Sequence, residues 1–211
     1  MKYKAIIFDL DGVICSTDHS HYLAWKQIAG EIGVEFNETI NNRLRGISRR
    51  ESLEIILGDR SGEYSEEAKA AMTERKNQLY RDLLQGMSPR DLSPAVKNTL
   101  DLIKAQGIKV AIGSSSQNAK FILRQLGLED YFDAISDGTN ITRSKPDPEV
   151  FLKASDYLGI EPRCCLVVED AQSGVEAALA ANMDCAAIGY AVRCELATYR
   201  LQQFEDLLLY I

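Results

Sequence analysis

The sequence predicts an α/β fold, a doubly wound, Rossmann-like parallel sheet with an inserted α-helical domain. Three observations lead to this prediction. Short apolar runs alternate with segments of helical periodicity over most of the chain, which is typical of βαβ units. The runs are continuously apolar, so helices should cover both faces of the sheet. Near the N-terminus, helical patterns follow one another without a strand between them.

Five apolar runs are the expected strands, and the first ends at an aspartate. They are residues 4–9, 108–112, 134–135, 164–168 and 185–188. One helix should begin at the N-cap Ser93, with Pro94 in its first turn, and stop at Gly107. Three further helical patterns cover residues 121–128, 150–158 and 175–179.

The stretch from about residue 18 to residue 87 is the inserted domain. Trp25 lies on one amphipathic face with neighbouring apolar residues, so we assign it to the core of this domain. Ser48 and Glu51 form the pattern of a capping box, and Ser65 should cap a long third helix. The prediction is a core domain of residues 1–16 and 88–211 with a cap domain of residues 17–87.

Composition excludes several classes of protein. The net charge of −7, with acidic residues spread along the chain, argues against nucleic acid or an anionic membrane as a partner. The longest apolar run, residues 185–192, is far shorter than the ~20 residues of a membrane helix, and the N-terminal run is too short for a signal peptide. Five cysteines without C-x-x-C spacing are expected to be reduced packing residues. We expect a cytoplasmic protein.

Polar residues follow several of the predicted strands. In a parallel sheet, ligands bind beyond the carboxyl ends of the strands, so these residues should surround one point. Each of them alone is as well explained by a helix cap, a turn or a solvated loop. The set consists of carboxylates, hydroxyls and one amine: Asp9, Asp11, Ser114, Ser115, Ser116, Lys145, Glu169 and Asp170.

The chemistry of this set points to phosphoryl transfer. Clustered carboxylates repel one another and need a cation, and oxygen ligands without sulfur select Mg²⁺, which a substrate phosphate can complete. Ser114 and Lys145 would then hold the phosphoryl oxygens. The sequence predicts a magnesium-dependent phosphoryl-transfer site.

These motifs resemble the haloacid dehalogenase superfamily in order and spacing, over the whole sheet domain. The matching segments are Asp9-Leu10-Asp11-Gly12-Val13, the turn at Ser114, Lys145-Pro146-Asp147-Pro148 and Glu169-Asp170. The resemblance implies that Asp9 is the nucleophile, that Asp11 is the general acid and base, and that Ser114 and Lys145 clamp the phosphate. It implies Asp9, the Asp11 backbone carbonyl and Asp170 as metal ligands, with Glu169 close by or acting through water. Asp9 should stay ionised beside Mg²⁺ and Lys145, while the Asp11 side chain carries a proton.

The inserted domain adds a resemblance to the β-phosphoglucomutase family over nearly the whole chain. The matching residues are 17–21, 24–26, 45–49, 51–53, 75–77, 114–116 and 118. The resemblance implies interconversion of β-D-glucose 1-phosphate and glucose 6-phosphate through an aspartyl phosphate and β-glucose 1,6-bisphosphate, in a monomeric enzyme. It adds Thr17 and His21 to the catalytic residues. The implied substrate-binding residues are Gly46, Arg49, Ser52, Lys76, Ser115, Ser116 and Asn118.

A bisphosphate bound in two orientations needs a second anion site. Arg49 is the best candidate because its planar fork suits phosphate, and Ser116 and Asn118 could complete the site. The alternative is that Arg49 only faces solvent in the first turn of its helix. His21 and Lys76 could reach Asp11 when the cap closes, although an isolated histidine is more often a packing or surface residue.

Arg45 and Arg75 are expected to be solvated. Two residues depart from the family pattern: Ser16 replaces an aspartate at the hinge, and Gln117 replaces a basic residue near the second phosphate. Three functions stay open, namely a sugar phosphate mutase, a small-molecule phosphatase and a non-catalytic sugar phosphate binder. The intact motifs speak against the binder. A mutase and a phosphatase differ in whether a sugar hydroxyl or water accepts the phosphoryl group.

Overall fold

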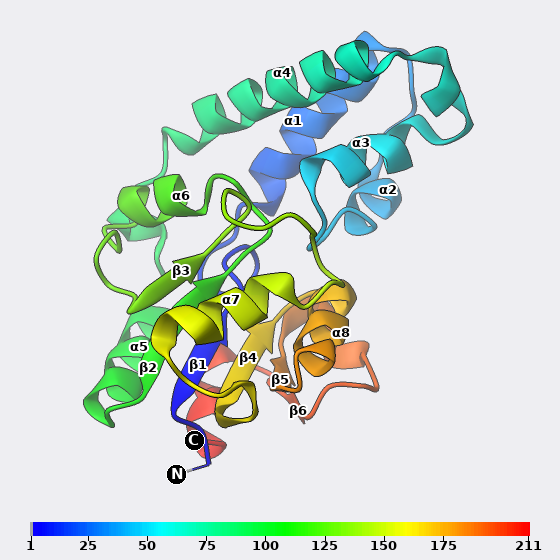
Figure 1. Cartoon of the computed structure of the whole chain (residues 1–211). Coiled ribbons are helices and arrows are strands. Elements are labelled where there is room, and N and C mark those ends of the chain that lie inside the picture. The colour runs from blue at the N-terminus through cyan, green and yellow to red at the C-terminus, as the bar shows by residue number, and fades with distance from the viewer. Residues whose placement is uncertain (1) are drawn as a thin grey trace.

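The computed structural model of the chain describes residues 2–211 and shows a helical cap above an α/β core (Figure 1). The core is built on a six-stranded sheet in which all strands run parallel, in the order β3-β2-β1-β4-β5-β6. The strands are β1 Ala5–Phe8, β2 Lys109–Gly113, β3 Ala134–Ser136, β4 Cys165–Glu169, β5 Asp184–Ala187 and β6 Tyr199–Arg200. The doubly wound parallel sheet is thereby confirmed.

The five expected strands lie within one residue of their predicted ends. The sixth, β6, was missed because Tyr199–Arg200 is a two-residue edge strand without an apolar run. Strand order reverses between β1 and β4, so the switch point of the sheet lies between these two strands.

Helices cover both faces of the sheet, as the continuous apolar strands require. Ile6 and Phe8 belong to one buried cluster, and Ala5 and Ile7 belong to the other, because successive side chains of a strand point to opposite faces. The first cluster includes α5 Pro94–Ala105 and α6 Ala119–Gln125, and the second includes α7 Glu149–Leu158 and α8 Gln172–Ala180. Ser93 is the N-cap of α5, but its side chain makes no capping hydrogen bond.

The cap consists of α1 Asp18–Glu31, α2 Glu38–Asn42, α3 Arg49–Leu57 and α4 Glu66–Leu84. The capping box of Ser48 and Glu51 and the cap at Ser65 are both confirmed. The short helix α2 was not expected from periodicity, and Asn37 caps it. Trp25 is buried in the apolar cluster of the cap, as predicted.

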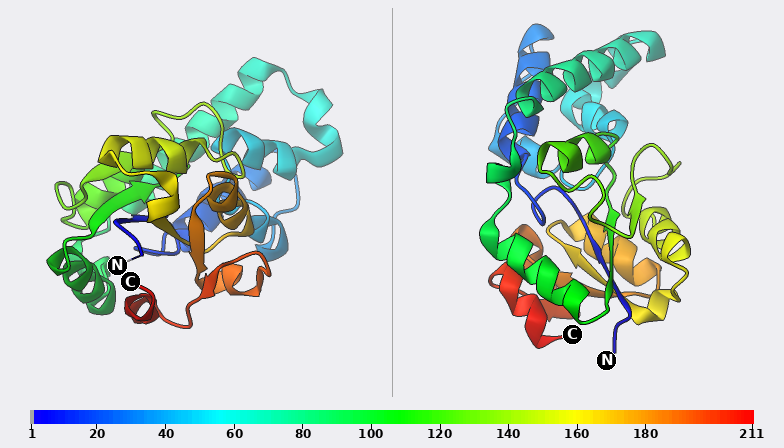
Figure 2. Two further views of the ribbon diagram at one scale, coloured as in Figure 1. Left: turned by 60° about the horizontal axis from the view of Figure 1, so that its bottom comes forward. Right: turned by 90° about the vertical axis from the view of Figure 1, so that its left-hand side faces the viewer.

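Short 3₁₀ helices complete the connections: η1 Gly58–Glu63, η2 Pro89–Asp91, η3 Pro162–Cys164, η4 Gly189–Arg193 and η5 Phe204–Leu209. Both chain ends lie at the end of the core away from the cap (Figure 2). All five cysteines are free, and Cys15, Cys165 and Cys185 are buried as packing residues. Within residues 2–211, no helix is long and apolar enough to cross a membrane.

Candidate active site

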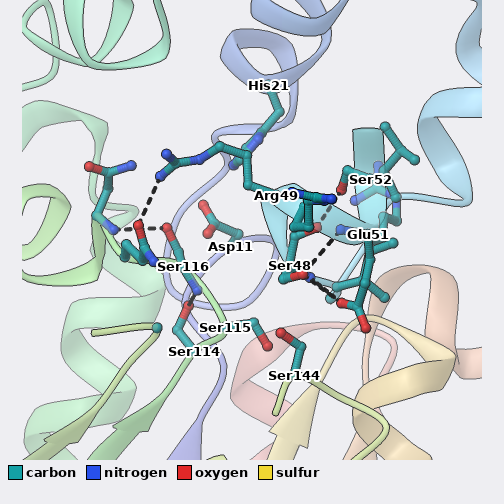
Figure 3. A pocket seen from close by; sticks show the side chains of 18 of the residues that line it. Asp11, His21, Ser48, Arg49, Glu51, Ser52, Ser114, Ser115, Ser116 and Ser144 are labelled. Atoms are coloured by element: carbon teal, nitrogen blue, oxygen red, sulfur yellow. Dashed lines mark hydrogen bonds between the residues drawn. The ribbon is translucent and has the colours of Figure 1, made fainter. Parts of the chain in front are cut away.

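A cavity of about 880 Å³ lies between the cap and the carboxyl ends of the strands (Figure 3). Core and cap both contribute to its wall. Most of the residues predicted for the site line it: Asp9, Asp11, His21, Gly46, Arg49, Ser52, Lys76, Ser114, Ser115, Ser116, Asn118 and Asp170. Thr17, Lys145 and Glu169 are buried and do not line the cavity.

The sheet brings the acidic residues together at the switch point. Phe8, the last residue of β1, pairs with Val168 of β4, so Asp9 follows β1 beside Glu169, the last residue of β4. The loop that follows Asp9 requires a glycine at position 12. Gly12 has a φ of 92°, and a Cβ atom there would collide with the carboxylate of Asp170. The close approach of this loop to Asp170 therefore depends on Gly12.

Lys145 lies among the carboxylates. Its Nζ atom is 2.5 Å from Asp9 Oδ1 and also contacts Glu169 Oε1. Burial lowers the pKa of Lys145, but the charges of Asp9 and Glu169 outweigh burial and raise it overall. Lys145 is therefore a fixed positive charge at the base of the site.

Asp9 is not kept ionised by Lys145 alone. Burial raises the pKa of Asp9 to about 7; Lys145 opposes this shift, and the charges of Glu169 and Asp11 add to it. Burial likewise raises the pKa of Asp170 to about 9, with further contributions from Glu169 and Asp9. Without a metal ion, burial and the neighbouring acidic charges therefore outweigh the effect of Lys145 on the pKa of Asp9. The expectation that Asp9 stays ionised concerns the site with Mg²⁺ bound and stays a prediction.

The metal ligands that the family resemblance implies stay a prediction. Among residues 2–211, no group of three or more histidine, cysteine or acidic side chains is arranged to hold a metal ion. Lys145 contacts both Asp9 and Glu169, Arg45 contacts Asp170, and Glu169 also accepts a hydrogen bond from the Ala171 amide at 2.9 Å. Glu169 is fully buried and does not line the cavity, and its place close to the metal or acting through water stays a prediction.

The remaining donors still fit a divalent cation. Asp9 and Asp170 line the same cavity, and the charge of Asp9 contributes to the raised pKa of Asp170. Mg²⁺ commonly takes only one or two protein carboxylates and completes its shell with water and phosphate oxygens. Asp9 and Asp170 are two buried carboxylates that nearby cations do not fully neutralise. They therefore form the kind of donor set that Mg²⁺ requires.

The metal-free charge imbalance predicts a pH-dependent stability. Asp170 has a folded pKa of about 9 against an ordinary value of 3.8, so the folded protein holds a proton that the unfolded chain releases. Between about pH 4 and 9 the free energy of unfolding should therefore fall as pH rises, by up to about 1.4 kcal/mol per pH unit for one proton. Chemical denaturation in EDTA should show a flatter pH profile for Asp170→Asn than for the wild type. Identical profiles would contradict the raised pKa.

Asp11 is connected to the cap through the hinge. Thr17 donates a hydrogen bond to Asp11 Oδ1, and the hydroxyl of Tyr80 on α4 donates to Thr17 at 3.0 Å. Burial raises the pKa of Asp11, although the Thr17 hydrogen bond lowers it. A buried carboxyl group with a raised pKa can carry a proton, as expected for Asp11. Sequence reasoning missed Tyr80, whose position four residues after Lys76 places both on one face of α4.

His21 and Lys76 contact each other. Lys76 Nζ lies 2.8 Å from His21 Nδ1 and above the ring of Tyr80. Burial, together with the charge of Arg49, lowers the pKa of Lys76 to about 7, while Asp11 opposes the shift. Neither side chain donates a hydrogen bond to Asp11 within residues 2–211, so their direct contact with Asp11 stays a prediction.

Arg49 reaches across the cavity from the first turn of α3. Its side chain is only 19% exposed, and its guanidinium donates to Gln117 Oε1 at 3.3 Å. The alternative of a solvent-facing Arg49 is therefore wrong. Arg75 is 57% exposed and pairs with Glu31, as the prediction of a solvated residue requires. Arg45 contradicts the same prediction, because it is 13% exposed and pairs with Asp18 and Asp170.

The loop after β2 presents hydroxyl groups to the cavity. Ser114 Oγ accepts a hydrogen bond from the Ser116 amide at 3.1 Å, and Ser116 Oγ accepts one from the Asn118 amide at 3.2 Å. Within residues 2–211, the buried Ser115 Oγ has no partner. A buried hydroxyl without a partner is costly unless a ligand satisfies it, so this loop is suited to bind oxygen atoms of a ligand.

Asn118 also links the core to the cap. Its Nδ2 atom donates to Asn77 Oδ1 of α4 at 2.9 Å. Beside the Arg49–Gln117 hydrogen bond, this is a second polar contact from the loop after β2 to the cap. Figure 3 shows Asp11, the serines of this loop and the segment from Ser48 to Ser52 facing the same space.

Known proteins match both the sequence and the fold. Residues 3–182 match the haloacid dehalogenase-like hydrolase family. The chain is 42% identical to the β-phosphoglucomutase of Bacillus subtilis, covering 98% of this chain and 92% of the relative. It is 33% identical to a phosphorylated carbohydrates phosphatase of Thermotoga maritima, covering 86% of this chain and 82% of the relative.

A solved structure is similar over nearly the full length. The crystal structure of β-phosphoglucomutase from Clostridium difficile superposes with a TM-score of 0.92 at 37% identity, covering 97% of this chain and 93% of the other. Sequence, fold and site geometry agree on one assignment. The chain belongs to the haloacid dehalogenase-like hydrolase family and is an enzyme, a phosphomutase or a phosphatase.

Proposed function

We propose that the protein is a β-phosphoglucomutase, which interconverts β-D-glucose 1-phosphate and glucose 6-phosphate through β-glucose 1,6-bisphosphate. One observation carries the choice: Arg49 of the cap extends over the cavity to the loop that carries Ser116 and Asn118. This arrangement offers a second phosphate a cation and polar groups while the first phosphate is at Asp9. The likeness to the Bacillus subtilis β-phosphoglucomutase supports the same choice.

In the proposed reaction, a carboxylate oxygen of Asp9 attacks phosphorus as the bond from phosphorus to the sugar oxygen breaks. Asp11 gives its proton to the leaving sugar oxygen. In the reverse transfer, a sugar hydroxyl attacks the aspartyl phosphate, Asp11 takes the hydroxyl proton, and the Asp9 carboxylate leaves. Ser114, which lines the cavity, would hold the transferring group, and Lys145 would add its positive charge from its contact with Asp9. Asp9, Asp170 and the backbone carbonyl of Asp11 would hold a Mg²⁺ ion, whose charge stabilises the phosphoryl oxygens.

The cap would favour the sugar over water as acceptor. The Arg49–Gln117 and Asn77–Asn118 hydrogen bonds join cap to core on one side of the cavity. A closed cavity that holds a sugar hydroxyl near the aspartyl phosphate leaves less room for attack by water. The second candidate is a sugar phosphate phosphatase, supported by the likeness to the Thermotoga maritima phosphatase. The domain limits given above, a monomeric state and a cytoplasmic location stay predictions.

The products distinguish the two candidates. Purified protein would receive β-glucose 1-phosphate, Mg²⁺ and a trace of β-glucose 1,6-bisphosphate, and both glucose 6-phosphate and free phosphate would be measured. We expect glucose 6-phosphate to accumulate faster than free phosphate. If only free phosphate were released, the proposal of a mutase would be wrong and the protein would be a phosphatase.

Replacing Arg49 with alanine should reduce mutase turnover more than hydrolysis. Losing a charge-assisted contact to the second phosphate costs about 1.5 to 3 kcal/mol, or roughly 10- to 150-fold in kcat/KM. Hydrolysis of acetyl phosphate should change little, because this substrate has no second phosphate. Arg75→Ala, on an exposed face of the cap, is the matched control. Equal losses with both substrates would mean that Arg49 supports the cap rather than a second phosphate.

A further inference from the structure

Arg45 joins the cap to the core beside the acidic cluster. It lies between α2 and α3, and its guanidinium forms two hydrogen bonds with Asp18 of the cap, at 2.8 and 2.6 Å. The same guanidinium donates to Asp170 Oδ2 of the core at 3.3 Å. It also lies 4.1 Å from the ring centroid of Tyr190 in η4. One side chain therefore bridges the first turn of the cap and two parts of the core.

The backbone at Arg45 is docked as well. Ser173 Oγ in α8 donates to the Arg45 carbonyl at 3.3 Å. The next residue, Gly46, has a φ of 74°, and a Cβ atom there would lie 2.5 Å from Ser173 Oγ. Only glycine permits this approach. The segment then enters α3 with Arg49 and Ser52, so docking at Arg45 fixes where those side chains enter the cavity.

The ion pair between Arg45 and Asp170 is largely shielded from solvent. The Arg45 side chain is 13% exposed and the Asp170 side chain is 7% exposed, so solvent screens their charges weakly. Asp170 is also one of the two carboxylates that would hold Mg²⁺ in the proposed function. A guanidinium in contact with that carboxylate neutralises part of the charge that attracts the ion, and it repels the ion directly.

We propose that Arg45 is a positioning residue that docks the substrate-binding segment of the cap on Asp170 and thereby weakens Mg²⁺ binding to the core. Cap docking on this side and metal binding then oppose each other. Because coupling between two binding events is reciprocal, Mg²⁺ should loosen the cap as much as the docked cap weakens Mg²⁺ binding. The proposal rests on the proposed function for the metal site at Asp170 and for the substrate-binding role of this segment.

Calorimetric titration with MgCl₂ tests the coupling without any turnover. Arg45→Met removes the charge and should bind Mg²⁺ about 3- to 10-fold more tightly than the wild type. Arg45→Lys keeps the charge but loses the planar fork, so its affinity should stay within about 2-fold of the wild type. Arg75→Met removes an exposed cap arginine and should not change the affinity. Arg45→Gln makes the same charge change as Arg45→Met and replaces it if that variant does not fold.

Small-angle X-ray scattering tests the docking half of the proposal. Adding MgCl₂ to the wild type should increase the radius of gyration as the cap loosens. Arg45→Met should start from the larger radius and respond little to the ion.

Three results would overturn the coupling. Equal Mg²⁺ affinity in the wild type and in both neutral Arg45 variants would do so while leaving the proposed function intact. A wild-type radius that does not respond to Mg²⁺ would do the same. Failure of the wild type to bind Mg²⁺ at all would overturn the metal site of the proposed function, and the coupling with it.

Discussion

Asp9→Asn is expected to abolish turnover while the fold persists. An amide oxygen is a poor nucleophile and cannot form the acyl phosphate that divides the transfer into two steps, so activity should fall by at least about 10³-fold. The fold should survive because Lys145 keeps Glu169 as a partner and the substitution removes one of several crowded carboxylates. Steady-state rates with β-glucose 1-phosphate check the loss of turnover. The thermal unfolding temperature of the same sample checks that the fold persists.

Intact-mass spectrometry adds a direct measurement of the nucleophile. The wild type incubated with acetyl phosphate should gain one phosphoryl group, and Asp9→Asn should gain none. Asp82→Asn makes the same chemical change on α4, at a side chain that accepts hydrogen bonds from the nearby Gln78 and Gln85, and serves as the control. Phosphorylation of Asp9→Asn, or more than a few per cent of residual activity, would remove Asp9 from the role of nucleophile.

Asp11→Asn is expected to slow phosphoryl transfer by about 10² to 10⁴-fold, the usual contribution of general acid and base catalysis. The asparagine side chain can still accept the Thr17 hydrogen bond but cannot exchange a proton with the sugar oxygen. Because the proposed metal contact of this residue is its backbone carbonyl, Mg²⁺ affinity should stay within about 3-fold of the wild type. Single-turnover rates and calorimetry measure the two quantities separately.

A leaving-group series strengthens the assignment of Asp11. The loss of transfer rate in Asp11→Asn should be smaller with acetyl phosphate, because its leaving group needs no proton. With sugar phosphates the whole loss of about 10² to 10⁴-fold should appear. Thr17→Val keeps the Asp11 carboxyl but removes its hydrogen-bond donor, and should cause a smaller loss with both substrates. A collapse of Mg²⁺ affinity in Asp11→Asn would show that the side chain itself binds the metal.

The sequence alone was sufficient for five of the six strands, for the helical insertion and for most of the cavity wall. Continuous apolar runs fix strands that are buried on both faces, and parallel strands place their carboxyl ends at one edge. The positions of Asp9, Asp11, Ser114 and Asp170 around one cavity follow from this topology. These features depend on local periodicity and on chain direction, both of which are readable along the sequence.

The tertiary structure decided the charge balance and the partners across the cap–core boundary. Lys145 meets Asp9 across 136 positions of sequence, and Arg45 meets Asp170 across 125. Arg45 and Arg75 are alike in sequence, yet one is buried against Asp170 and the other is exposed beside Glu31. Burial and distance set the strength of the electrostatic interaction between two charged groups, and both depend on how the cap packs on the core. Local sequence pattern carries neither quantity, so the raised pKa values of Asp9 and Asp170, the role of Tyr80 and the docking of Arg45 emerge only from the folded chain.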